Sequence, residues 1–133
     1  MEITPEQACE DLIMLLKRLK HSMAEVAELH ELTAIQLHAL HTISEGDITM
    51  GGLAHLMHCD ASNATGIVDR LVSQKLVTRE EKAHDRRAKT LVPTEKGKQI
   101  VRLVNSKLPT HLGVDKLSAS ERAKLHELIT KLA

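Results

Sequence analysis

The chain has 133 residues, the length of one domain that can bury a core without disulfides or a metal. Hydrophobic residues make up 42% and charged residues 27%, which argues against a disordered or fibrous protein, while 18 basic and 18 acidic side chains cancel. No Phe, Tyr or Trp is present, so the core must be built from aliphatic side chains. This favours helices and weakens any function that needs aromatic stacking.

The expected location is the cytoplasm. Cys9 and Cys59 are too few for a disulfide framework and indicate a reducing compartment. The longest purely apolar run, Leu12 to Leu16, is far shorter than the roughly 20 residues that span a bilayer. The first six residues lack the basic and apolar regions of an export signal. We therefore expect no membrane partner.

Charge is unevenly distributed along the chain. Residues 1–47 carry three basic and nine acidic side chains, whereas residues 48–99 carry nine basic and six acidic ones. An acidic first third beside a basic middle is expected when one face of a protein meets a polyanion. An ordinary solvated surface explains the counts equally well.

Capping signals predict the helices of the first third. Thr4, Pro5 and Gln7 predict the start of a helix that runs from Glu6 to about Leu29 along one apolar face. A second capping box, Thr33 with Gln36, predicts a helix that ends before Gly46.

The middle of the chain contains two more predicted helices and a hairpin. A short helix is expected from Met50 to His58, and a longer one, capped by Asp60 or Ser62, from Ala61 to about Gln74. Residues 76–79 and 90–92 are β-prone and flank a charged stretch, which predicts a two-stranded hairpin with a basic tip. Pro93 closes its second strand.

Two helices are predicted in the last third. Thr94 caps a helix that runs to about Leu108, after which Pro109 and Gly113 break the chain. The Ser118–Glu121 capping box then starts the final helix. Three helices followed by a β-hairpin make a winged helix-turn-helix. The fold class is therefore mainly α (α+β), with long terminal helices whose apolar stripes predict a homodimer.

Residues 53–97 resemble the MarR family of bacterial winged-helix regulators. The matching segments are Leu53-Ala54, the run from Ser62 to Leu71, Leu76-Val77-Thr78-Arg79, Asp85-Arg86-Arg87 and Thr94-Glu95-Lys96-Gly97. The resemblance implies one domain over residues 1–133, with dimerisation helices in 1–32 and 100–133 and a DNA-binding lobe in 33–99. It also implies that residues 61–74 form the recognition helix and that residues 85–87 form the tip of the wing.

The first turn of the recognition helix is the first candidate DNA contact. Ser62, Asn63 and Thr65 are short polar side chains that can reach base edges or phosphates, and the helix N-terminus offers N–H groups to phosphate. Helix capping explains Ser62 equally well, whereas for Thr65, which lies further into the helix, DNA contact is the favoured interpretation.

The wing is the second candidate. Arg86 and Arg87 are placed where a wing can enter a minor groove, and Asp85 would orient an arginine, since a carboxylate repels phosphate. On charge alone a solvated turn with a local ion pair is the simpler interpretation, and the family resemblance favours DNA. Weaker candidates for phosphate contacts are Arg70, Arg79, Lys82 and Lys89, of which Arg70 can instead form a structural ion pair.

Two residues depart from the family pattern. Lys75 stands where a glycine commonly ends the recognition helix, and a left-handed Lys there costs about 1 kcal/mol unless the turn is rebuilt. Pro93 replaces a usual Leu. Both concern the geometry of the hairpin more than the DNA surface.

Nine histidines raise the question of a sensor. His55, His58 and Cys59 are close in sequence, but they lack a carboxylate or second cysteine at ligand spacing, so we assign no metal and no cofactor. Members of the family also include oxidant sensors with a cysteine near the position of Cys9. The resemblance further implies a small-molecule effector in a crevice that His30, His38 and His41 border.

We therefore predict a homodimeric, DNA-binding transcriptional repressor that reads a pseudo-palindromic operator and responds to an effector. The alternatives are a winged-helix protein-interaction module without DNA binding and a metal- or oxidant-sensing variant of the regulator. Catalysis is not expected, because the sequence contains no HExxH, Walker loop, GxGxxG or nucleophile elbow.

Overall fold

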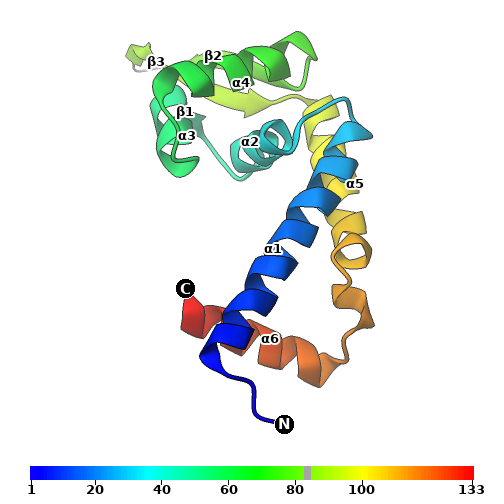
Figure 1. Ribbon diagram of the computed structural model, residues 1–133. Coiled ribbons are helices and arrows are strands. Elements are labelled where there is room, and N and C mark those ends of the chain that lie inside the picture. The colour runs from blue at the N-terminus through cyan, green and yellow to red at the C-terminus, as the bar shows by residue number, and fades with distance from the viewer. Residues whose placement is uncertain (83–84) are drawn as a thin grey trace.

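The computed structural model describes residues 1–82 and 85–133, with the side chains of residues 82 and 85–88 outside the description. Helices dominate the fold, and a small antiparallel sheet lies at one end (Figure 1). In chain order the elements are α1 (Pro5–Glu28), α2 (Ala34–Ser44), β1 (Ile48–Thr49), α3 (Met50–Leu56), α4 (Ala61–Ser73), β2 (Val77–Lys82), β3 (Asp85–Pro93), α5 (Glu95–His111), the 3-10 turn η1 (Val114–Lys116) and α6 (Ala119–Leu132). The expected class, mainly α with a winged helix-turn-helix, is confirmed.

The capping boxes start their helices as predicted. In each box a side-chain oxygen accepts the backbone N–H three residues on, while the residue at that position reaches back to the cap's own N–H. Thr33 Oγ1, for example, accepts the Gln36 N–H at 3.2 Å, and Gln36 Oε1 accepts the Thr33 N–H at 3.0 Å.

A lobe made of α2, α3, α4 and the sheet holds the core. Its most deeply buried side chains are aliphatic: Leu40, Ile43, Leu53, Val68, Leu71, Leu76, Val77 and Leu91. The end of α1, through Val26, and the middle of α5, through Val101 and Val104, pack into the same core. Both long helices are therefore anchored in the lobe.

The sheet differs from the predicted hairpin. It has three strands in the order β1-β3-β2, and β1 pairs with the second hairpin strand through Ile48 opposite Leu91. The hairpin strands are also longer than predicted and include much of the charged stretch. A two-residue strand is too short to show alternation, and charged residues conceal strand signals, so the sequence pattern was uninformative at both places.

Three helix boundaries also differ. α3 ends at Leu56 rather than His58, and α4 at Ser73 rather than Gln74. The expectation that Pro109 breaks the chain was wrong, because α5 runs through it to His111. Pro109 removes only its own N–H from the hydrogen-bond ladder, and the chain stops at Gly113, whose φ is 78°.

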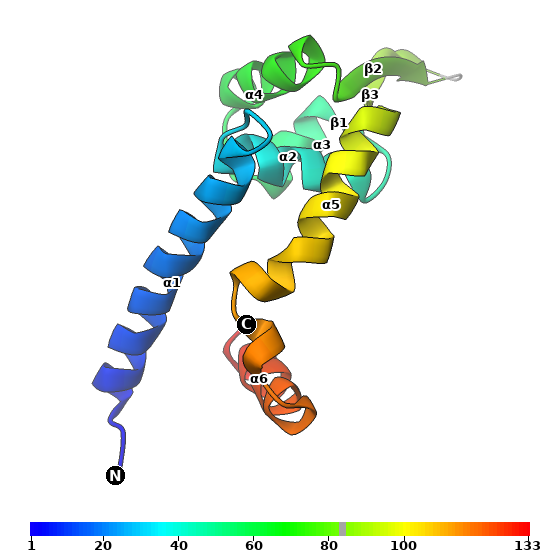
Figure 2. The same cartoon turned by 90° about the vertical axis from the view of Figure 1, so that its right-hand side faces the viewer.

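The far ends of α1, α5 and α6 lie away from the lobe. α1 and α5 leave the lobe as separate rods, and α6 crosses at their far end (Figures 1 and 2). α6 contains no buried residue, and Leu128 and Leu132 are 59% and 70% exposed. Leu12 on α1 is 50% exposed. These helices therefore carry an unpartnered apolar surface.

Candidate nucleic-acid interface

The start of α4 is capped by Asp60. Its Oδ1 accepts the Asn63 N–H at 2.8 Å and the Ser62 hydroxyl at 3.0 Å. These hydrogen bonds lower the pKa of the Asp60 carboxyl, and the bond from the Asn63 N–H has the largest effect. Of the two predicted caps, the structure thus uses Asp60. The carboxylate therefore occupies the Asn63 N–H, one of the backbone donors at the start of the helix that were predicted to face phosphate.

The predicted contact residues of α4 face solvent. Ala64, Val68 and Leu71 turn into the core, while Ser62, Asn63 and Thr65 are exposed. Thr65 Oγ1 donates to the Ala61 carbonyl at 2.8 Å, and its lone pairs stay available as acceptors. The lobe thus presents the polar side of α4 outward, along one edge of the molecule (Figure 1).

Lys75 ends the recognition helix in the left-handed conformation. Its φ is 62°, its N–H donates to the Val72 carbonyl at 2.9 Å, and the Leu76 N–H donates to the Leu71 carbonyl at 2.9 Å. This pair of bonds is a Schellman motif, which glycine normally supplies. The turn is therefore retained with Lys in place of Gly.

Thr94 joins the end of α4 to the start of α5. Its hydroxyl donates to the Lys75 carbonyl at 2.7 Å and accepts the Gly97 N–H at 3.1 Å. A Cβ at Gly97 would lie 2.3 Å from the Leu76 carbonyl oxygen, so only glycine fits there. The Thr-x-x-Gly segment thus fixes the recognition helix against a long helix that leaves the lobe.

Arg79 forms an ion pair with Asp69 that the sequence reasoning missed. Its guanidinium on β2 contacts the carboxylate on α4. The two residues are ten positions apart on different elements, so no helical or strand spacing signals the contact. The pairing occupies one of the predicted phosphate-binding side chains and ties the wing to the recognition helix.

The other candidates lie at or near the wing. Arg70 and Lys89 are exposed, and no ion pair of Arg70 is found among the described side chains. The side chains of Lys82, Asp85, Arg86 and Arg87 lie outside the description, and their predicted roles stay predictions. The backbone places the last three at the start of β3, beyond α4.

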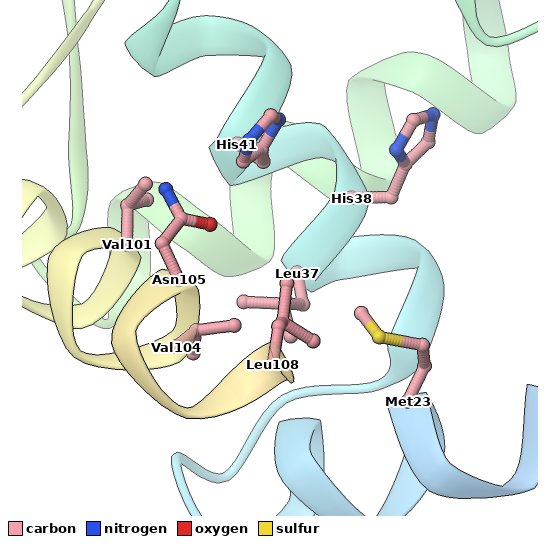
Figure 3. A pocket seen from close by; sticks show the side chains of 8 residues that line it. All are labelled: Met23, Leu37, His38, His41, Val101, Val104, Asn105 and Leu108. Carbon is pink, nitrogen blue, oxygen red and sulfur yellow. The ribbon is translucent and has the colours of Figure 1, made fainter. Parts of the chain in front are cut away.

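A cavity of about 190 Å³ lies between the lobe and the long helices. Figure 3 shows Leu37, Val104 and Leu108 in its middle. His41 and Asn105 lie to one side of them, and His38 and Met23 to the other (Figure 3). His41 also pairs with Glu45 at 3.4 Å. Two of the predicted crevice residues, His38 and His41, line this cavity, whereas His30 lines a separate surface hollow near Leu29 and Lys96.

Across the described part of the chain, no three His, Cys, Asp or Glu side chains form a group that could hold a metal ion. Cys9 is exposed on α1, and Cys59 is half-buried just before α4. No described helix has the length and hydrophobicity needed to cross a membrane.

Known proteins share this architecture. The sequence model of the MarR family matches residues 32–89. The reduced form of MarR from E. coli superposes with a TM-score of 0.80 at 26% identity, over 99% of this chain and 98% of that one. A mutant E. coli MarR complexed with operator DNA superposes with a TM-score of 0.72 at 27% identity, over 92% of this chain and 91% of that one. AbsC from Streptomyces coelicolor superposes with a TM-score of 0.75 at 23% identity, over 99% of this chain and 95% of that one. This similarity is evidence for the fold alone. No curated protein sequence matches the chain.

The lobe, its exposed helix and its hairpin define a winged helix-turn-helix protein. Residues 32–89 of the chain match the MarR family, and the whole chain is similar in structure to MarR itself. Members of this family regulate transcription and are not enzymes.

Proposed function

We propose that the protein is a cytoplasmic transcriptional repressor that binds a pseudo-palindromic operator as a homodimer. As in the prediction from the sequence, we assign DNA binding to residues 33–99 and dimerisation to residues 1–32 and 100–133. The observation that carries the proposal is the outward, polar face of α4, held rigidly by a buried inner face, an Asp60 cap and the Thr94 clamp. The similar E. coli MarR with operator DNA supports a partner of this chemistry.

The DNA-contacting set that we propose combines the recognition helix and the wing. Ser62, Asn63 and Thr65 would read base edges in a major groove, and Arg86 and Arg87, oriented by Asp85, would enter the adjacent minor groove. Arg70, Lys82 and Lys89 would contact phosphates. Arg79 would act mainly through its pairing with Asp69.

A second copy of the chain is the proposed cover for the exposed apolar helices. An open groove of about 380 Å³ separates α1 from α6 and is lined mainly by aliphatic side chains such as Leu12, Leu15, Leu125 and Leu128. A 14-residue helix with no buried side chain has little to stabilise it in water. Packing against the same helices of a partner would supply the missing contacts.

The cavity between the lobe and the long helices is the proposed effector site. Its apolar walls suit a ligand of about one ring, and His38, His41 and Asn105 could hold a carboxylate or another polar group. A ligand there would touch α2 of the lobe and α5 of the dimerisation helices together. It would therefore favour one spacing of the two recognition helices over another.

The test is binding to a duplex that the protein itself selects from a random-sequence library. We expect retardation of this duplex with an affinity that falls steeply with salt, because neutralised phosphates release counterions. An interaction module would show no such binding. Arg87→Ala should weaken binding and flatten the salt slope by about one phosphate equivalent per wing.

The charge-matched control for Arg87→Ala is Lys124→Ala. Lys124 is exposed on α6, far from α4. It should leave affinity and slope unchanged. Equal slopes for the wild type and Arg87→Ala would remove the wing from the proposed interface.

A further inference from the structure

Gly66 is in the interior of the recognition helix, where glycine is unfavourable. It is the sixth residue of the 13-residue α4 and is exposed. Glycine in a helix interior is less favourable than alanine by about 1 kcal/mol, because it gains no side-chain contact and loses more backbone freedom. Either the fold requires this glycine for a reason other than helix stability, or the glycine destabilises the helix without any benefit to the fold.

Most other glycines of the chain have a reason within the fold. Gly46 and Gly113 have positive φ angles, and a Cβ at Gly97 or Gly52 would crowd neighbouring atoms at 2.3 and 3.1 Å. Gly51 lies in the first turn of α3, where the helical penalty is smaller.

Neither reason applies to Gly66. Its φ is not positive, and outside its own helix backbone no heavy atom of the described residues lies within 4 Å of where a Cβ would stand. Alanine would therefore fit without any adjustment, and the fold itself gives no reason for glycine.

The position of Gly66 indicates what the missing side chain makes room for. At 100° per residue, Gly66 points almost directly away from the buried Ala64, Val68 and Leu71. Ser62 and Asn63 lie one turn before it, and Asp69 and Arg70 one turn after it. Gly66 is therefore a shallow gap in the middle of the outward polar surface of α4.

We infer that Gly66 is a specificity-determining residue: it lets the backbone of α4 approach the bases of the major groove, so that the base pair beneath it is read by close contact. This inference rests on the proposed DNA-binding function and deepens it. A side chain here would hold the helix away from the groove, and the contacts of Ser62 and Asn63 would lengthen with it. The major groove offers thymine methyl groups and base edges that such close approach can distinguish.

The test compares Gly66→Ala with the wild type in stability and in DNA binding. Alanine should raise the midpoint of urea unfolding, because it is the better helix former and meets nothing. The same variant should bind the duplex selected by the wild type at least about tenfold more weakly, the loss expected for one damaged base contact. From a random library it should select sites that differ at one base-pair position in each half-site.

Ser73→Ala is the matched control. Ser73 is exposed at the end of α4, two turns beyond Gly66 on the same side, and its hydroxyl bonds only within its own helix, to the Arg70 carbonyl. This variant also improves helix propensity, so its stability should be equal to or above that of the wild type, while its affinity and selected site should stay unchanged.

The possible outcomes separate the two claims. A wild-type protein that selects no duplex overturns the proposed function, and this inference with it. A wild type that binds while Gly66→Ala binds the same sites equally well overturns the inference alone. A Gly66→Ala variant that is less stable than the wild type also overturns it, because the glycine would then serve the fold.

Discussion

Among the described residues, three that are not glycine adopt a backbone conformation that usually requires glycine. Glu31, His58 and Lys75 have φ angles of 58°, 52° and 62°, and they follow the ends of α1, α3 and α4. The same pair of backbone hydrogen bonds closes each end; after α3, for instance, the Cys59 N–H donates to the Ala54 carbonyl at 3.1 Å. A Cβ in this conformation is strained by about 1–2 kcal/mol, so the ends of three helices all carry removable strain.

Replacing Lys75 with glycine should therefore stabilise the fold. Lys75→Gly removes the strain, although the extra freedom of glycine in the unfolded chain offsets part of the gain. We expect the free energy of unfolding in urea to rise by about 0.5–1 kcal/mol. Lys75→Ala is the control, since it removes the charge and keeps the Cβ. Equal gains for both variants would assign the effect to charge rather than to strain.

The residue-level signals that the sequence revealed were local ones. The capping boxes at Thr4, Thr33 and Ser118 could be predicted, because both partners of each box lie within three residues. The strain at Lys75 could be anticipated from the residue type and its place in the family pattern. The need for glycine at position 97 has its cause in Leu76, more than 20 residues away, and no local pattern contains it.

At the level of elements, the ion pair between α4 and β2 determines how much charge this side of the lobe exposes to solvent. Asp69 lies toward the outward side of α4, and Arg79 reaches it from the wing. The paired charges cancel, so Arg79 is not expected to add to the salt dependence of DNA binding while the pair is intact. The pair is partly exposed and stabilises the fold by no more than about 1 kcal/mol.

The pair predicts opposite effects for its two single variants. Asp69→Asn frees a guanidinium, so binding to an arbitrary duplex should become tighter and its salt slope steeper by up to about one phosphate equivalent per protomer. Arg79→Gln leaves the carboxylate unpaired, so binding should weaken. Titrations of a fluorescent duplex at several salt concentrations measure both.

The double variant is the control for this experiment. Asp69→Asn combined with Arg79→Gln has the same net charge as the wild type, so its salt slope should lie close to the wild-type value. An unchanged slope in Asp69→Asn alone would show that Arg79 remains withheld from DNA without its partner.

The elements themselves show where sequence reasoning succeeds and fails. Helices of 11 residues or more were predicted, because their apolar periodicity and capping residues agree. β1 was missed because two residues carry no period, and it exists only through its pairing with β3. Of the cavity, the sequence indicated His38 and His41, but Met23 and Asn105 reach it from other helices, and only the packing brings them there.

For the whole molecule, the decisive question is what covers α1 and α6. The lobe has a closed aliphatic core, whereas the far ends of the long helices expose leucines over more than one turn. Monomeric soluble proteins rarely expose extended apolar patches. Two lobes joined through these helices would place two α4 helices on one side of DNA, where half-sites one helical turn, about 34 Å, apart can be read together.

A charge placed in the groove between α1 and α6 should separate the two copies. Leu128 lines this groove, and Leu128→Glu would bury a carboxylate without a partner in the proposed interface, which is strongly unfavourable. We expect sedimentation velocity at micromolar concentration to show a monomer, with less helix by circular dichroism as α6 loses its packing. Thr130→Glu, on the same helix but outside the lining of the groove, introduces the same charge and should remain dimeric.

DNA binding should weaken in Leu128→Glu although every proposed contact residue is intact, because a single lobe reads one half-site and gains nothing from the second. A Leu128→Glu protein that sediments and binds like the wild type would place the dimer interface elsewhere.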